Sequence, residues 1–211
     1  MKKIHWSFWG LLLALTGLWL LADTWWPAQG GFFPLRTAWV QYSGVLAMGM
    51  MSVAMVLAAR PTWLEARLDG LDKMYRFHKW LGIGALVLAV THWLWAQSPR
   101  GAGGWGWLPR PARGARPEYT GLQAVLVSWR ELAEGLGEWA FYAAVVLIVL
   151  ALIKRFPYRL FAKTHQLLAV AYLVLAFHTV VLVKFDYWTQ PVGWVMALLT
   201  AAGTVSALWV L

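Results

Sequence analysis

The sequence predicts an all-α fold, an integral membrane bundle of six helices within a single domain over residues 1–211. Of its 211 residues, 61% are hydrophobic and only 13% are charged, whereas soluble domains are roughly 45–50% apolar and about 25% charged. Tryptophan occurs 17 times, and this residue is enriched where helices meet the membrane–water interfaces. The excess apolar surface therefore requires lipid as its solvent.

Six apolar segments come close to the roughly 20 residues that a membrane-spanning helix needs. Met1, Lys2 and Lys3 precede the first segment, but no small-residue cleavage site follows it, so we expect an uncleaved helix rather than a signal peptide. We expect spanning helices over residues 6–21, 37–59, 80–96, 139–153, 160–183 and 191–211.

The basic residues predict how these helices are oriented. Eleven Lys and Arg residues lie on the side of the two termini and seven on the other side, five of which belong to the longest connection. The positive-inside rule gives little weight to charges far from the helix ends. We therefore expect a multi-pass protein of the inner (plasma) membrane, with both termini in the cytoplasm.

The connection between the third and fourth helices, about residues 97–137, has two parts. Residues 98–117 are rich in Gly, Pro and Arg, which predicts irregular structure. The second part has apolar residues at helical spacing and predicts a short amphipathic helix, either lying on the outer membrane surface or packed on the bundle. These apolar residues are Leu122, Val125, Leu126, Trp129, Leu132 and Leu136.

Composition excludes several classes of function. The chain has no Cys, which rules out disulfides, cysteine-ligated iron–sulfur clusters, thiolate haem ligation and thiol nucleophiles. Its net charge of +9 comes from basic residues that mostly flank apolar runs, which does not indicate nucleic-acid binding. Residues 101–106 match G-x-G-x-x-G, but no strand precedes them, and the nucleotide-binding motif depends on that context.

Four of the five histidines fall on two of the predicted helices. His78 and His92 belong to the third helix and its start, His165 and His178 belong to the fifth, and His5 lies in the basic flank before the first. Ionisable side chains inside membrane spans are rare and usually functional. A lone histidine could merely hydrogen-bond a neighbouring helix, but two pairs with matched spacing favour a shared function.

The spacing of these histidines suits two metal centres at different depths. The 14 residues from His78 to His92 rise about 21 Å, and the 13 residues from His165 to His178 rise about 20 Å. Because the third and fifth helices run in the same direction, we expect His78 to pair with His165 near the cytoplasmic face, and His92 with His178 near the outer face. Each pair could clamp one iron, which predicts two b-type haems between the two helices. Thirteen residues also leave roughly 140° of rotation, which tilt, supercoiling or a π-bulge could absorb.

Ligation by two histidines determines the chemistry of such a haem. Both axial positions are filled, so the haem passes single electrons rather than activating a bound substrate. Tyr172 could lie between the haems or serve ordinary packing. Basic residues that could hold haem propionates, or could be simple positive-inside flanks, are Arg76, Lys79 and Lys163 at the inner level and Arg36 and Lys184 at the outer level.

The pattern resembles the ferric-reductase-like transmembrane domain, the membrane core shared by ferric reductases and NADPH oxidases. The resemblance rests on six helices, with H-x13-H on the third and H-x12-H on the fifth, and it covers essentially the whole chain. Residues 71–82, LDKMYRFHKWLG, and residues 156–165, FPYRLFAKTH, are similar to bacterial members. The chain departs from the oxidases at Ala171, where they carry an aromatic residue; here the aromatic residue is Tyr172.

The resemblance implies transmembrane electron transfer. NAD(P)H would reduce FAD in a cytoplasmic domain, and electrons would pass through the inner and then the outer haem to ferric iron or dioxygen outside. It implies the core of an oxidoreductase that is not catalytically complete without a flavin reductase domain or a separate flavoprotein. The last helix ends at Leu211 without a basic flank, so we expect either a segment of a longer enzyme or an unusually short chain.

Two alternatives stay open at this point. The chain could be a stand-alone haem-binding relay subunit that serves a separate periplasmic reductase such as a methionine sulfoxide reductase. It could also be a haem-free transporter or channel, which would be colourless when purified.

Overall fold

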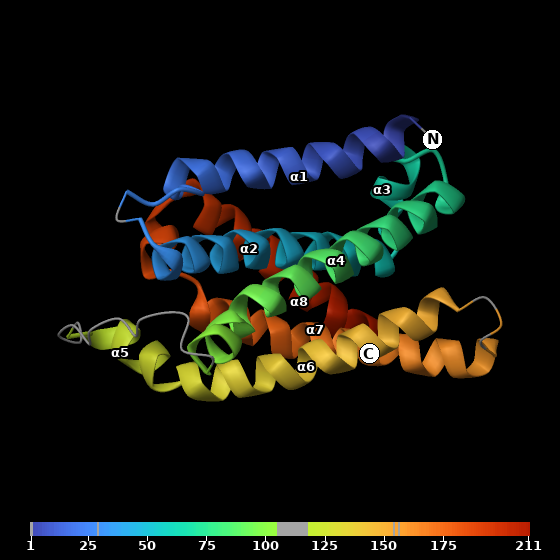
Figure 1. Cartoon of the computed structure of the whole chain (residues 1–211). Coiled ribbons are helices and arrows are strands. Elements are labelled where there is room, and N and C mark those ends of the chain that lie inside the picture. Colours follow the sequence, from blue (N-terminus) through green and yellow to red (C-terminus); the bar gives the residue numbers. More distant parts are fainter. Residues whose placement is uncertain (1, 29, 105–117, 154, 156) are drawn as a thin grey trace.

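All regular structure among the described residues is helical, which confirms the predicted all-α fold (Figure 1). The computed structural model describes residues 2–28, 30–104, 118–153, 155 and 157–211, with the backbone alone for residues 99–104. Within these described ranges, six helices are long and apolar enough to cross a membrane, as predicted. They are α1 (Lys2–Ala22), α2 (Phe32–Ala58), α4 (Leu71–Gly104), α6 (Arg130–Leu152), α7 (Tyr158–Leu182) and α8 (Pro191–Val210).

Helix α4 begins at Leu71, well before the predicted start at residue 80, and the reason lies in its first turns. Charged residues alternate there with Met74, Phe77 and Leu81, which recur at helical spacing and are almost completely buried. These three side chains pack in one cluster with Met50 and Leu57 of α2. The apolar face therefore extends the helix through a segment whose charges lower its mean hydropathy.

The predicted amphipathic helix between the third and fourth spans is divided in the structure. Helix α5 (Gly121–Ser128) ends before Trp129, and α6 starts at Arg130, so Leu132 and Leu136 belong to the fourth spanning helix instead. The prediction of irregular structure over residues 98–117 is wrong for residues 98–104, which continue α4, while residues 105–117 lie outside the described part of the chain. The first four residues of the G-x-G-x-x-G match are thus helical.

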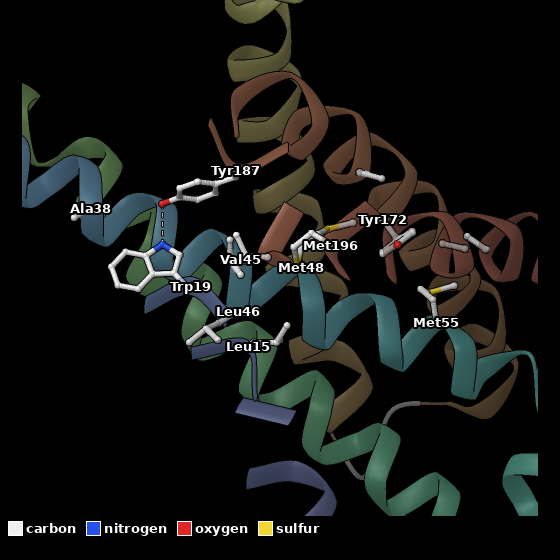
Figure 2. Close-up of a cluster of buried hydrophobic side chains, with 14 residues drawn as sticks. Leu15, Trp19, Ala38, Val45, Leu46, Met48, Met55, Tyr172, Tyr187 and Met196 are labelled. Carbon is white, nitrogen blue, oxygen red and sulfur yellow. Dashed lines mark hydrogen bonds between the residues drawn. The ribbon is translucent and has the colours of Figure 1, made fainter. Parts of the chain in front are cut away.

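Helix α2 lies at the centre of the bundle. It packs against α4 on one side and α8 on another, α1 runs along it, and α6 pairs with α7 (Figure 1). Trp19, Tyr172 and Tyr187 are the largest fully buried side chains, and all three belong to one core cluster (Figure 2). The short helices α3 (Thr62–Arg67) and η1 (Phe185–Thr189) connect spans at opposite ends of the bundle.

A polar clasp, formed by Trp19, Asp23, Lys184 and Tyr187, ties the end of α1 to the segment between α7 and α8. The Trp19 indole N–H donates to the Tyr187 hydroxyl at 2.9 Å (Figure 2), and this hydroxyl donates to Asp23 Oδ2 at 2.6 Å. The Lys184 ammonium also bonds Asp23 Oδ2. Burial alone would raise the pKa of the Asp23 carboxyl, but the bonds from Lys184 and Tyr187 outweigh it, so this pKa lies below its ordinary value of 3.8. Burial and the neighbouring carboxylate raise the pKa of Tyr187.

Candidate functional site

The four predicted histidines form two pairs between α4 and α7. The ring centres of His78 and His165 are 5.9 Å apart, with the ring planes at 63°. Those of His92 and His178 are 6.3 Å apart at 79°. The structure thus brings together the residues that the spacing pairs, at two levels of the bundle. No group of three or more His, Asp or Glu able to hold a metal ion exists among the described residues.

Both ring separations suit a metal held from two sides. Two imidazoles that bind one ion through nitrogen at about 2.0–2.1 Å place their ring centres roughly 6 Å apart. Figure 1 shows α4 running obliquely to α7, so one face of α4 can meet different faces of α7 at the two levels. This tilt accommodates the rotation between His165 and His178 that an ideal straight helix would impose.

Three of the four imidazoles have their orientation and tautomer fixed by a backbone carbonyl. His78 Nδ1 lies 2.9 Å from the Ala54 oxygen, and His92 Nδ1 lies 2.9 Å from the Val40 oxygen. His178 Nδ1 lies 2.8 Å from the carbonyl oxygen of Ala133 on α6. A carbonyl can only accept, so Nδ1 carries the proton and the Nε2 lone pair is left for a ligand. Histidines that bind metals are commonly held in this way.

Two glycines make room for the imidazoles of His92 and His178. A methyl group on Gly137 would lie 2.0 Å from His178 Nδ1, and one on Gly44 would lie 3.2 Å from His92 Cε1. Each glycine stands four residues after the carbonyl that its histidine uses, so its own N–H is the helical partner of that carbonyl. The absence of a side chain lets the imidazole reach an oxygen that is already inside the helix ladder.

Sequence reasoning missed both glycines. A glycine inside a spanning helix has many possible reasons, close helix packing being the commonest. A glycine that faces a histidine on a neighbouring helix would have indicated this role, but the sequence does not show which helices pack against each other.

His165 is held differently from the other three. Its Nδ1 is buried and has no hydrogen-bond partner among the described residues. Instead, its ring stacks on Phe161, with ring centres 4.9 Å apart and planes at 21°. The two residues are four positions apart on α7, the spacing that brings side chains together on one helix face. The sequence therefore contained this contact, although it was not singled out.

A cavity of about 360 Å³ opens beside His92 and His178, between α2, α4, α6 and α7. Its volume falls within the roughly 300–1,000 Å³ of small-molecule sites. Apolar side chains form most of its wall, and His92 and His178 both line it. The charged and amide side chains of the wall are Arg36, Gln41, Gln97, Arg130, Glu134 and Glu138.

Two arginines place guanidinium groups in the cavity wall, which also carries Glu134 and Glu138. Arg36 is anchored on α4 through the carbonyl oxygens of Trp95 and Ala96, at 3.0 and 2.7 Å. Arg130 stacks over the Phe185 ring, 5.0 Å from its centre, and its buried Nε has no partner in the described part of the chain. Arg36 was a sequence candidate for an anionic cofactor group, whereas Arg130 was missed because the fourth span was expected to begin at residue 139.

The remaining candidates lie elsewhere. Lys184 pairs with Asp23, and Arg76 pairs with Asp72 one helical turn before it. Tyr172 points toward α2 and α8: its hydroxyl bonds Ser52 Oγ at 2.9 Å and the Thr200 carbonyl oxygen at 3.2 Å. The Tyr172 hydroxyl thus links α7 to α2 and α8 in the middle of the bundle.

Comparison with protein families gives one match. Residues 43–176 fit the model of the family described as ferric reductase like transmembrane component. The matched segment contains His78, His92 and His165 and ends two residues before His178. Neither the curated proteins nor the solved structures gave a significant match.

Proposed function

Because the chain belongs to the ferric-reductase-like transmembrane family, we propose that it carries electrons across a membrane through two b-type haems, each held by one histidine pair. The family makes it a membrane component of the oxidoreductase type. The observation that carries the proposal is the pairing of imidazoles about 6 Å apart, with Nδ1 of three of them committed to backbone carbonyls.

The residues present fit such a cofactor. His78 and His165 would hold the inner haem, and His92 and His178 the outer one. The mainly apolar cavity beside the outer pair offers Arg36 and Arg130 to the carboxylates of its haem. When bound between two imidazoles, the haem supplies one-electron chemistry with no open axial position. The protein's part is to orient the rings, to exclude water and to hold the two haem sites at different depths. Two sites divide the electron's path across a membrane core of about 30 Å into shorter steps.

Electron flow would run outward, from the end that carries both termini. We propose that this end faces the cytoplasm of a plasma membrane, where a flavin reduced by NAD(P)H is the donor, and that ferric iron or dioxygen is the acceptor outside. An outward electron gains about 2.3 kcal/mol per 100 mV in an inside-negative potential. In the relay alternative, a separate periplasmic protein takes the electron.

The test is to purify the chain in detergent and to measure haem per chain with oxidised and dithionite-reduced spectra. Two low-spin haems in the wild type are expected. His92→Ala or His178→Ala should remove the outer haem, and His78→Ala or His165→Ala the inner one. His5→Ala is the matched control, because His5 is exposed and lies outside both pairs. A colourless wild type would overturn the proposal and favour a transporter or channel.

A further inference from the structure

One face of α4 changes from basic and aromatic to apolar along its length. Tyr75 and Lys79 begin this face one turn apart, at the end of the bundle where α1 begins (Figure 1). The face continues at intervals of three or four residues, which places its side chains in one stripe. Its further members are Ile83, Val87, Val90 and Leu94. Val87 is 59% exposed and Leu94 is 57% exposed, so the described residues leave the apolar part of this stripe open to lipid.

Arg60 enlarges the basic end of the stripe. Its guanidinium lies over the Tyr75 ring, with Cζ 5.4 Å from the ring centre, a separation at which a cation and an aromatic face attract each other. Arg60 follows the C-cap of α2 with a φ of 52°, which glycine adopts more easily, so the turn itself does not account for an arginine there. The Arg60 side chain is exposed and forms no ion pair within the described part of the chain. The guanidinium is therefore held at the start of the stripe and is available to an anion.

The nearby carboxylates do not neutralise this end of the stripe. Two of them already have basic partners, in the ion pairs of Asp69 with Lys3 and Lys73 and of Asp72 with Arg76. Glu65 on α3 pairs with neither Arg60 nor Lys79. Arg60 and Lys79 therefore give the start of the stripe a net positive charge.

The length of the stripe fits one leaflet of a bilayer. Trp63 on α3 is 58% exposed, and exposed tryptophan beside a spanning helix is typical of the headgroup level. The 11 residues from Lys79 to Val90 rise about 16 Å, which is about half of a hydrocarbon core of about 30 Å. The stripe thus combines cations at headgroup depth with apolar side chains over the depth of one acyl chain.

We propose that this face of α4 binds an anionic phospholipid of the leaflet at the end that carries both termini. Arg60 and Lys79 hold its phosphate, and one acyl chain lies along Ile83, Val87 and Val90. A guanidinium can bind two phosphate oxygens through parallel N–H bonds. A zwitterionic lipid brings a cation of its own, which the basic side chains repel, so the site selects an anionic headgroup. This proposal is independent of the proposed function, because it uses none of the four paired histidines.

The experiment titrates the delipidated full chain in detergent with phosphatidylglycerol, and separately with phosphatidylcholine of the same acyl chains. Native mass spectrometry counts the lipids bound per chain. The first phosphatidylglycerol should bind several-fold more tightly than the first phosphatidylcholine. Arg60→Gln should weaken the first phosphatidylglycerol on the order of fivefold, because one basic group near a membrane surface contributes about that factor. Arg60→Lys should weaken it less, since it keeps the charge and loses only the planar fork.

Arg155→Gln is the matched control for a basic flank that serves only to orient the protein. Arg155 is exposed at the same end of the bundle and lies outside the stripe, and its replacement should leave the affinity for phosphatidylglycerol unchanged. Circular dichroism and the affinity for phosphatidylcholine should be those of the wild type in all three variants, which shows that the fold is intact. Inorganic phosphate at millimolar concentration should not displace phosphatidylglycerol, because it has no acyl chain for the apolar part of the stripe.

Equal affinity of the wild type for the two lipids would overturn the proposal. An Arg60→Gln protein that keeps the wild-type affinity for phosphatidylglycerol would overturn it as well. An equal loss in Arg155→Gln would show that the effect is general to the basic end, and displacement by phosphate would assign Arg60 to a free anion instead of a lipid. A wild type without haem would refute only the proposed function.

Discussion

The inner and outer histidine pairs are built in different ways. In the outer pair both imidazoles donate to helix carbonyls, both rest against a glycine, and both line a cavity with two arginines. In the inner pair only His78 has a carbonyl partner, while His165 lies on the Phe161 ring. Main-chain carbonyls thus orient both rings of the outer pair, whereas one ring of the inner pair rests on another side chain.

The difference has an electronic meaning as well as a mechanical one. A hydrogen bond from Nδ1 makes an imidazole a stronger donor to a metal, which favours the ferric state. The outer pair has this bond on both sides and the inner pair on one. Main-chain atoms therefore orient both rings of the outer pair, whereas in the inner pair a contact with the Phe161 ring takes the place of one carbonyl bond.

The largest effect is expected when a side chain is added at the glycines beside the outer pair. Gly137→Ala places a methyl group 2.0 Å from His178 Nδ1, so we expect loss of the outer haem, retention of the inner one and about 1–3 kcal/mol of destabilisation from overpacking. Gly44→Ala is milder at 3.2 Å and should keep both haems with an altered outer spectrum. Haem quantification and low-temperature EPR measure both variants.

Gly135→Ala controls for helix substitution as such. It lies on the same helix, and a methyl group there would meet nothing within 4 Å. If Gly135→Ala also lost the outer haem, the inference that Gly137 makes room for the His178 imidazole would be wrong.

A smaller effect is expected from a change in the packing around Tyr172, which tests whether the two histidine pairs are independent of that packing. Tyr172→Phe removes the hydroxyl that bonds Ser52 and the Thr200 carbonyl, which should cost about 1 kcal/mol of stability. Haem content and both spectra should be unchanged, because this hydroxyl lies toward α2 and α8. Tyr75→Phe on the exposed surface should not change stability. A spectral shift in Tyr172→Phe would contradict the view that the two sites differ for local reasons only.

The smallest effect concerns the pH dependence of stability at the end of the bundle that carries Asp23 and Lys184. The Asp23 carboxyl has a pKa below 3.8 when folded, so its bonds to Lys184 and Tyr187 stabilise the fold above that pH and are lost as pH falls through the folded pKa. Asp23→Asn should lower the melting temperature by about 2–4 °C at pH 7. The gap between variant and wild type should begin to narrow as the pH falls below about 3.8 and should close once the pH is below the folded pKa. A gap that does not narrow on acidification would show that the carboxylate charge is not what matters.

The sequence predicted the larger features well because they depend on composition and period. Six apolar runs and two pairs of histidines at nearly equal spacing were sufficient for the fold class and for the pairing of positions across α4 and α7. The role of these histidines as haem ligands stays a prediction.

Finer features depended on neighbours that a linear pattern does not reveal. The early start of α4 comes from Met74, Phe77 and Leu81 packing on α2. The space that Gly44 and Gly137 leave for an imidazole depends on which helix faces each histidine. Arg130 lines the cavity because α6 begins at this residue, whereas hydropathy predicts a start at residue 139.

Helix α1 has a mechanical consequence for the molecule. It is a strap fastened at two ends: the exposed pair of Lys3 and Asp69 at its start, and the half-buried pair of Asp23 and Lys184 at its finish. Between them only Ile4, Leu15 and Trp19 of the helix are buried. A force applied to the N-terminus would release the first fastening early and then meet resistance at the second. Peeling of α1 would therefore proceed in two force steps rather than one.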